Sequence, residues 1–195
     1  MLKDLLAINN ATAEQYHADR RGFLKLGLGS VAALGFWMPG LGHAGQTVTG
    51  REITMVNAHT GYAFKGEYWY DGKYLPDAFR EIKALMRDHR TGEKFPIDPR
   101  LMDILFVLHN RMDSQNSFKV FSGYRSPKTN AMLKRRSEGV ASGSLHMSGQ
   151  AVDLKLPGAK LSALRKQAMA LKSGGVGFYP KSDFVHIDTG RVRTW

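Results

Sequence analysis

Regular patterning of apolar and polar side chains begins near residue 51. Residues 51–58 alternate and are rich in β-prone side chains, and residues 63–70 carry several aromatic ones. The stretch between them, residues 59–61 (His-Thr-Gly), is a polar turn sequence. Alternation with a period of two is typical of strands with one buried face, so these stretches predict a β-hairpin.

Other stretches repeat apolar side chains every three or four positions, which is typical of amphipathic helices. One of them also has a start signal. Asp98 can accept hydrogen bonds from the free amides of a first turn, and Pro99 stands where a missing N–H costs nothing. The predicted helices cover residues 76–89, 99–112, 127–136 and 161–171.

Short apolar stretches bounded by glycine, serine or proline predict the remaining strands. These strands cover residues 118–122, 151–156, 174–180 and 184–188, and residues 139–143 form a loop of small side chains. Helices and strands follow one another without a regular βαβ repeat. We therefore expect an α+β fold with a mainly antiparallel sheet flanked by helices.

The first 44 residues resemble a twin-arginine export signal. Residues 20–25 (RRGFLK) precede an apolar run of roughly 16 residues, shorter than the ~20 that a membrane span needs. Small side chains follow, so we expect cleavage after Ala44, release into the periplasm, and no stable membrane insertion afterwards. A buried N-terminal helix or an uncleaved anchor is the alternative. Residues 45–50 are then a linker and residues 51–195 the functional domain.

Charge narrows the possible partners. The formal charge is +11 for the whole chain and +10 without residues 1–44, which hold four basic and three acidic residues. So basic a domain favours polyanions, such as nucleic acid, anionic lipid or acidic cell-wall polymer. We expect the wall polymer and no nucleic acid, because the chain has an export signal and no nucleic-acid motif.

The chain contains no cysteine, so a metal ion would be held by histidine, aspartate or glutamate. The candidate ligands are His146, Asp153 and His186. The chain must turn at Gly149 to bring the first two to one point, and His186 lies on another predicted strand. Zn²⁺ accepts two imidazoles and a carboxylate and, in a catalytic site, keeps one position for water. The His-x6-Asp spacing alone is a weak signal.

The sequence around these residues is more specific than their spacing. Residues 144–153 (SLHMSGQAVD) and 183–186 (DFVH) resemble the metal-binding segments of the zinc D-Ala-D-Ala peptidase and hedgehog-type superfamily. Within that superfamily the chain resembles the murein endopeptidase K branch over essentially all of residues 51–195, which implies the superfamily's fold. The stretches that carry this second resemblance are residues 57–61, 122–127, 174–180 and 186–190, with Trp195.

The resemblance implies that His146, Asp153 and His186 bind one Zn²⁺ per chain. It also implies an acidic general base three residues before the last ligand, which is Asp183 here. Several relatives have the longer glutamate at this place, so Asp188 is a rival candidate. It lies two residues beyond His186 on a predicted strand, and its side chain therefore points to the same face. Asp188 would be either the base or a partner that orients an imidazole.

Further residues are candidates for substrate binding. Arg125, in the segment GYRS, would bind a substrate carboxylate, stabilise the oxyanion or form a structural ion pair. Ser144 would hydrogen-bond the substrate or cap its loop. His59 would line the cleft or hydrogen-bond within its turn. Tyr124 and Tyr179 would flank the groove, unless their rings belong to the edge of the core.

The resemblance implies an exported zinc metallopeptidase that hydrolyses peptide cross-links of peptidoglycan in cell-wall remodelling. Links between two diaminopimelate residues are the expected substrate. One alternative is a D-Ala-D-Ala carboxypeptidase or dipeptidase that uses the same site. Another is a non-catalytic zinc-fold module that binds peptidoglycan, because a fold by itself does not imply activity.

Overall fold

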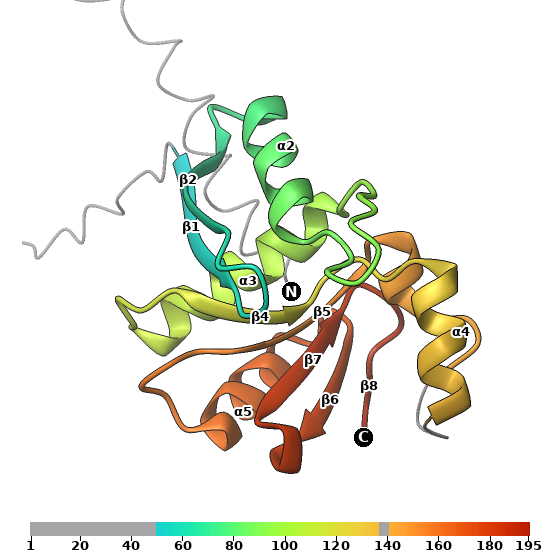
Figure 1. Ribbon diagram of the computed structural model, residues 1–195. Coiled ribbons are helices and arrows are strands. Elements are labelled where there is room, and N and C mark those ends of the chain that lie inside the picture. The colour runs from blue at the N-terminus through green and yellow to red at the C-terminus, as the bar shows by residue number, and fades with distance from the viewer. Residues whose placement is uncertain (1–49, 137–140) are drawn as a thin grey trace, which may run out of the picture. The chain divides into compact units, whose positions relative to one another are not determined.

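The computed structural model of the chain describes residues 50–136 and 141–195 (Figure 1). The predicted export signal, most of the predicted linker and residues 139–140 of the predicted loop lie outside this described part. Among the described residues, no helix is long and apolar enough to cross a membrane.

The described chain forms one eight-stranded sheet in the order β3-β2-β1-β4-β5-β7-β6-β8. Neighbouring strands are antiparallel except for β1 with β4 and β6 with β8, so the predicted α+β class with a mainly antiparallel sheet is confirmed. The strands are β1 (Gly50–Asn57), β2 (Ala63–Tyr70), β3 (Lys73–Tyr74), β4 (Phe118–Ser122), β5 (Ala151–Lys155), β6 (Gly175–Tyr179), β7 (Phe184–Asp188) and β8 (Arg193–Thr194).

The helices follow the predicted periodicity closely. Asp98 caps the second of them as expected, accepting a hydrogen bond from the Arg100 amide at 2.9 Å. The first helix ends four residues before its predicted end, because from Met86 the chain turns into a loop closed by hydrogen bonds between Asp88 and residues 92–93. The helices are α2 (Pro76–Leu85), α3 (Pro99–Met112), α4 (Pro127–Arg136) and α5 (Leu161–Leu171), with 3₁₀ turns η2 (Leu145–Ser148) and η3 (Pro180–Ser182).

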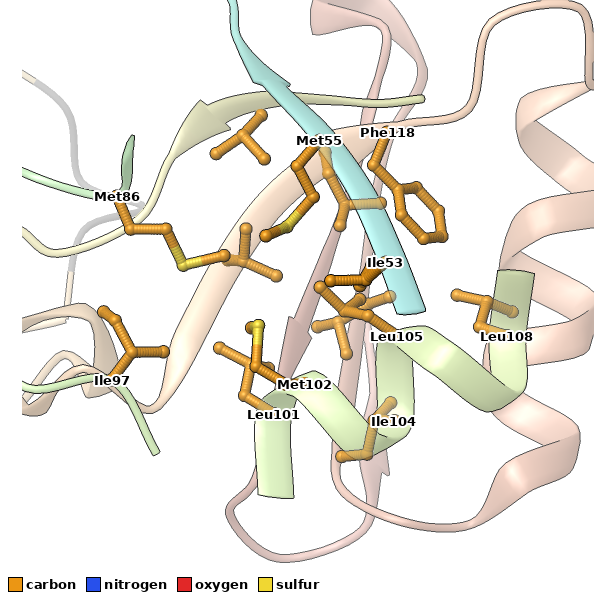
Figure 2. Close-up of a cluster of buried hydrophobic side chains, with 14 of the residues drawn as sticks. Ile53, Met55, Met86, Ile97, Leu101, Met102, Ile104, Leu105, Leu108 and Phe118 are labelled. Atoms are coloured by element: carbon orange, nitrogen blue, oxygen red, sulfur yellow. The ribbon is translucent and has the colours of Figure 1, made fainter. Parts of the chain in front are cut away.

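One face of the sheet holds the hydrophobic core. Val152 and Leu154 of β5, and Val185 and Ile187 of β7, point to this face, where α3 and α5 cover them. Figure 2 shows the part of this core between α3 and the central strands, including Met55. Each fully buried aliphatic side chain of this kind contributes about 1.5–3 kcal/mol of transfer free energy.

Residues at the alternate positions of these strands point to the opposite face. On β5 these positions are Asp153 and Lys155, and on β7 they are Phe184, His186 and Asp188. The helical face is thus used for stability. The opposite face carries the side chains capable of chemistry.

Candidate metal centre and its cleft

Three donor atoms converge on the open face of the sheet. Asp153 Oδ1 lies 2.8 Å from His186 Nδ1 and 3.3 Å from His146 Nε2, and the two imidazole nitrogens are 3.2 Å apart. Ligands bound tetrahedrally at ~2.0–2.1 Å from Zn²⁺ lie about 3.3 Å from one another. The spacing and the chemistry of this donor set therefore fit one zinc ion.

Strand register and a tight turn bring these donors together. Asp153 and His186 are direct partners across the antiparallel pair β5–β7, so their side chains stand side by side on one face. His146 comes from η2, and Gly149 then reverses the chain into β5 with a φ of 65°. A side chain at Gly149 would also strike the carbonyl oxygen of Pro96, so only glycine fits this turn.

Hydrogen bonds on the far side of each ring fix which nitrogen faces the centre. His146 Nδ1 lies 2.7 Å from the Gly123 carbonyl oxygen, and His186 Nε2 lies 3.0 Å from Asp188 Oδ2. Carbonyl and carboxylate oxygens only accept, so these ring nitrogens carry the protons. The opposite nitrogens face Asp153 and are the ones placed to bind a metal ion. Metal-binding histidines are typically held in this way.

Asp188 is itself held tightly beneath the centre. The carboxylate is fully buried and accepts hydrogen bonds from the Gly175 and Gly190 amides and from the Arg193 guanidinium, at 2.7–3.1 Å. Burial alone would raise the pKa of Asp188, but the hydrogen bonds from His186, Arg193 and these amides hold it well below its usual range. These hydrogen bonds hold the Asp188 carboxylate in place against the His186 ring.

The charges of the centre stabilise one another. Burial would raise the pKa of Asp153, but the neighbouring imidazoles of His146 and His186 outweigh burial and lower it. Burial also opposes a charged His186, whereas its hydrogen bonds to Asp153 and Asp188 raise its pKa. These directions are those of a pocket that favours positive charge next to Asp153.

An open cleft lies over the centre. One side of it comes from η2 and the loop before it, including Ser144, and the other side is largely aromatic. The aromatic side comprises Tyr179, Phe184 and Trp195, and Trp195 Nε1 donates a hydrogen bond to the Tyr179 hydroxyl at 2.8 Å. A long substrate can therefore reach the centre from solvent along this groove.

Arg125 lies in the cleft with spare hydrogen-bonding capacity. Its side chain is only 13% exposed, its Nη2 is 3.7 Å from Asp153 Oδ2, and its Nη1 is 3.4 Å from Asn130 Oδ1. Its Nε has no hydrogen-bond partner among the residues that the structure describes. Burial lowers the pKa of Arg125, although Asp153 partly offsets this effect. A buried, under-satisfied guanidinium is suited to bind an oxyanion or carboxylate of a ligand.

The structure places the remaining predicted site residues differently. Ser144 lines the cleft and also caps η2, because its hydroxyl accepts a hydrogen bond from the His146 amide at 3.4 Å. Asp183 lies at the start of β7, with 61% of its side chain exposed, and forms an ion pair with Lys155. Asp183 does not line the cleft, and its ion pair with Lys155 brings it to the edge of the face that carries Asp153.

Two predicted substrate-binding residues do not line the cleft. Tyr124 is only 7% exposed and its ring stacks on Phe95 at 5.1 Å, so its burial favours the core-edge alternative. His59 hydrogen-bonds through Nε2 to the Phe121 carbonyl at 3.0 Å and stacks on His89 at 3.9 Å. These contacts tie the His59 side chain to β4 and to the loop after α2, so it neither lines the cleft nor hydrogen-bonds within its own turn.

Sequence reasoning assigned no role to Arg193 or to the side chain of Trp195. Both lie over β6, where Gly175 and Gly177 leave room for them. A side chain at Gly177 would strike the Trp195 ring, and one at Gly175 would strike the Arg193 guanidinium. Alternate glycines within a strand indicate that another part of the chain approaches closely. Here that part is the C-terminal segment with Arg193 and Trp195.

The fold and the site together define a hydrolytic peptidase with a candidate metal centre. The family model described as "Peptidoglycan L,D-endopeptidase MepK" matches residues 45–195, and the chain belongs to this family. The predicted resemblance to the murein endopeptidase K branch is therefore confirmed.

Individual relatives agree with the family match. The peptidoglycan L,D-endopeptidase MepK of Escherichia coli (strain K12) is 39% identical over 183 residues, which cover 93% of this chain and 100% of that protein. The protein of the same name from Shigella flexneri gives the same values. The probable peptidoglycan L,D-endopeptidase MepK of Haemophilus influenzae is 39% identical over 146 residues, which cover 74% of this chain and 78% of that protein.

Proposed function

We propose that this chain is a zinc-dependent L,D-endopeptidase that hydrolyses peptide cross-links of peptidoglycan. The observation that carries the proposal is the donor triangle of His146, Asp153 and His186, which has tetrahedral spacing and lies under an open cleft. The family membership supports the same activity. The expected bond joins two diaminopimelate residues, because such a link runs from an L-centre to a D-centre.

In the proposed reaction, the protein holds the metal ion and orients its ligands. When bound, a zinc ion would lower the pKa of a water molecule towards ~7 and polarise the scissile carbonyl. His146, Asp153 and His186 hold the ion. The Gly123 carbonyl and Asp188 fix the two imidazoles, so no reorientation is needed during the reaction.

Arg125 binds negative charge next to the reacting carbonyl. Its guanidinium enters the cleft near Asp153 and still has an unpaired Nε–H among the described residues. Charge that develops on the carbonyl oxygen in the transition state is stabilised by such a pre-positioned donor. A substrate carboxylate is the other group that Arg125 can bind.

Asp183 is the proton acceptor that we propose. Its carboxylate is mostly exposed and pairs with Lys155 of the strand that carries Asp153, so it is accessible to take the proton of the attacking water and pass it to the leaving amine. The rival, Asp188, already accepts hydrogen bonds from four residues and has no exposed surface. Accessibility therefore favours Asp183 as the base and leaves Asp188 to position His186.

The test is digestion of purified cross-linked peptidoglycan, followed by mass spectrometry of the released muropeptides. We expect loss of diaminopimelate–diaminopimelate dimers that stops with chelator and with His186→Ala. Shortened stems with all dimers intact would instead establish the carboxypeptidase. Binding to peptidoglycan with no change in its muropeptides, by protein that carries one zinc per chain, would establish the non-catalytic module.

Export by the twin-arginine route belongs to the same proposal. Residues 20–25 and the apolar run after them support it, together with a substrate that lies in the cell envelope. Replacement of Arg20 and Arg21 by lysine should retain the protein in the cytoplasm. N-terminal sequencing of exported protein should begin at Gly45, and an intact N-terminus would contradict cleavage.

A further inference from the structure

Two lysines face each other across neighbouring strands on the open face of the sheet. Lys119 of β4 and Lys155 of β5 are direct register partners in the antiparallel pair. Like charges placed opposite each other in this way destabilise a sheet. The two facing lysines therefore lower the stability of the fold. Their placement indicates a role other than stability.

An aromatic ring lies near both ammonium groups. The Nζ atoms of Lys119 and Lys155 are each 5.9 Å from the centroid of the Phe121 ring. A ring face at this distance attracts a cation and partly offsets the repulsion. The Phe121 ring thereby holds both lysine side chains near it.

The local charge is not balanced within the described protein. Lys155 forms an ion pair with Asp183, whereas Lys119 has no ion pair among residues 50–136 and 141–195. Two lysines and one carboxylate are thus found here, and the net charge of the three groups is positive. An anionic group bound between the lysines would neutralise it.

The lysine pair lies beside the cleft. Lys155 lies two residues after Asp153 on β5, so it is about 6.6 Å further along the same strand and on the same face. The centroids of the Phe121 and Phe184 rings are 6.3 Å apart, and Phe184 lines the cleft. A substrate that leaves the centre in this direction passes the aromatic rings and then meets the lysines.

We propose that Lys119 and Lys155, with the Phe121 ring, form a subsite that binds a carboxylate of the substrate's peptide stem. The inference rests on the proposed function, because it assumes that a cross-linked peptide lies in the cleft. Each diaminopimelate residue of such a cross-link keeps a carboxylate outside the peptide chain. This subsite would select stems in which that carboxylate is free over stems in which it is amidated.

The test compares two ligands on the full chain. A diaminopimelate-linked muropeptide dimer with free side-chain carboxylates and the same dimer in amidated form are titrated by calorimetry, with chelator present to prevent turnover. We expect Lys119→Gln to weaken binding of the free acid about tenfold, the lower range for a charge-assisted contact, and to leave the amidated dimer unchanged. Lys119→Arg should retain most of the affinity.

Lys166→Gln is the matched control, because Lys166 is exposed on α5, the helix that covers the opposite face of the sheet. Equal effects of Lys119→Gln on both dimers, or equal effects of the two glutamine variants, would overturn the subsite. The proposed function is judged separately by zinc-restored turnover. Wild-type protein that binds the free acid through Lys119 and yet cleaves neither dimer would refute the activity and keep the subsite.

Discussion

His186 and Asp188, two residues apart on β7, form a 3.0 Å hydrogen bond that points the other nitrogen of His186 towards Asp153. Both side chains share one face because the residue between them, Ile187, is buried in the core. The same strand thus supplies a metal-ligand candidate and the carboxylate that orients it. This relationship links the strand pattern directly to the chemistry of the site.

Asp188→Asn should weaken zinc binding by about 10–100-fold, the usual effect of removing a partner that orients a ligating histidine. Asparagine offers one acceptor oxygen where Asp188 now serves His186, two amides and Arg193. Competition with a chelating indicator measures the affinity. Asp77→Asn, on the exposed surface of α2, is the control. Unchanged zinc affinity in Asp188→Asn would refute the orienting role.

Arg125→Lys should lower kcat/KM by about 100-fold, the cost of losing one pre-positioned donor to a developing oxyanion. Lysine keeps the charge but not the planar fork of donors, so it should not rescue activity. Steady-state cleavage of a cross-linked dimer measures the effect, and zinc content shows that the centre is intact. Arg165→Lys is the control, because Arg165 lies over the Phe178 ring of the strand next to α5. An active Arg125→Lys enzyme would limit Arg125 to a structural role.

Asp183→Asn should reduce kcat by about 100-fold or more while zinc stays bound, because general-base catalysis commonly contributes 10²–10⁴-fold. If Asp183 only balances Lys155, the loss will be a few-fold at most. Comparison with Asp188→Asn, assayed at saturating zinc, completes the test. Near-normal turnover in the first variant and none in the second would reverse the two assignments.

The buried carboxylate of Asp88 should make the free energy of unfolding depend on pH. Burial alone would raise its pKa, but hydrogen bonds from Thr129, Ser126 and Arg90 hold it well below its usual range. A carboxyl group with a lowered pKa stabilises the fold above its unfolded pKa of ~3.9, and this contribution is lost as pH falls through the folded value. Asp88→Asn should therefore lower the free energy of unfolding by about 1–3 kcal/mol at pH 7.

The gap between wild type and Asp88→Asn should narrow as pH falls below about 4, because the unfolded wild-type chain then binds the proton. Urea unfolding at pH 7 and pH 3 measures both differences. Asp88 also accepts hydrogen bonds from the amide and hydroxyl of Ser126, next to Arg125. A gap of equal size at the two pH values would show that the charge of Asp88 is not what stabilises this loop.

Much of the fold could be predicted because its patterns are local. The strand Ala63–Tyr70 and the helices Pro99–Met112 and Leu161–Leu171 have the predicted bounds, since their apolar pattern marks all three and Asp98 also caps the first of the two helices. The two-residue strands β3 and β8 were not predicted. Two residues are too few to show an alternation of apolar and polar side chains. Only the pairing with a neighbouring strand defines β3 and β8.

The site was predictable to the same extent. The resemblance implied His146, Asp153 and His186 as one ligand set, although their spacing alone was a weak signal, and the structure brings the three side chains together. The placement of Tyr124 in the core depends on long-range packing against Phe95, which no local pattern contains. The contact of Arg193 with Asp188 could not be predicted for the same reason, since only the pairing of β8 with β6 brings the two side chains together.

The central claim is that one metal ion, held by these three residues, drives hydrolysis of an L,D-linked peptide bond. Its most direct test is the cleavage rate of a purified diaminopimelate-linked dimer by wild type and His186→Ala, after chelation and after addition of one equivalent of zinc. We predict no cleavage after chelation, full recovery with zinc in the wild type, and none in the variant. A wild-type rate unaffected by chelation, or a zinc-independent His186→Ala enzyme, would contradict it.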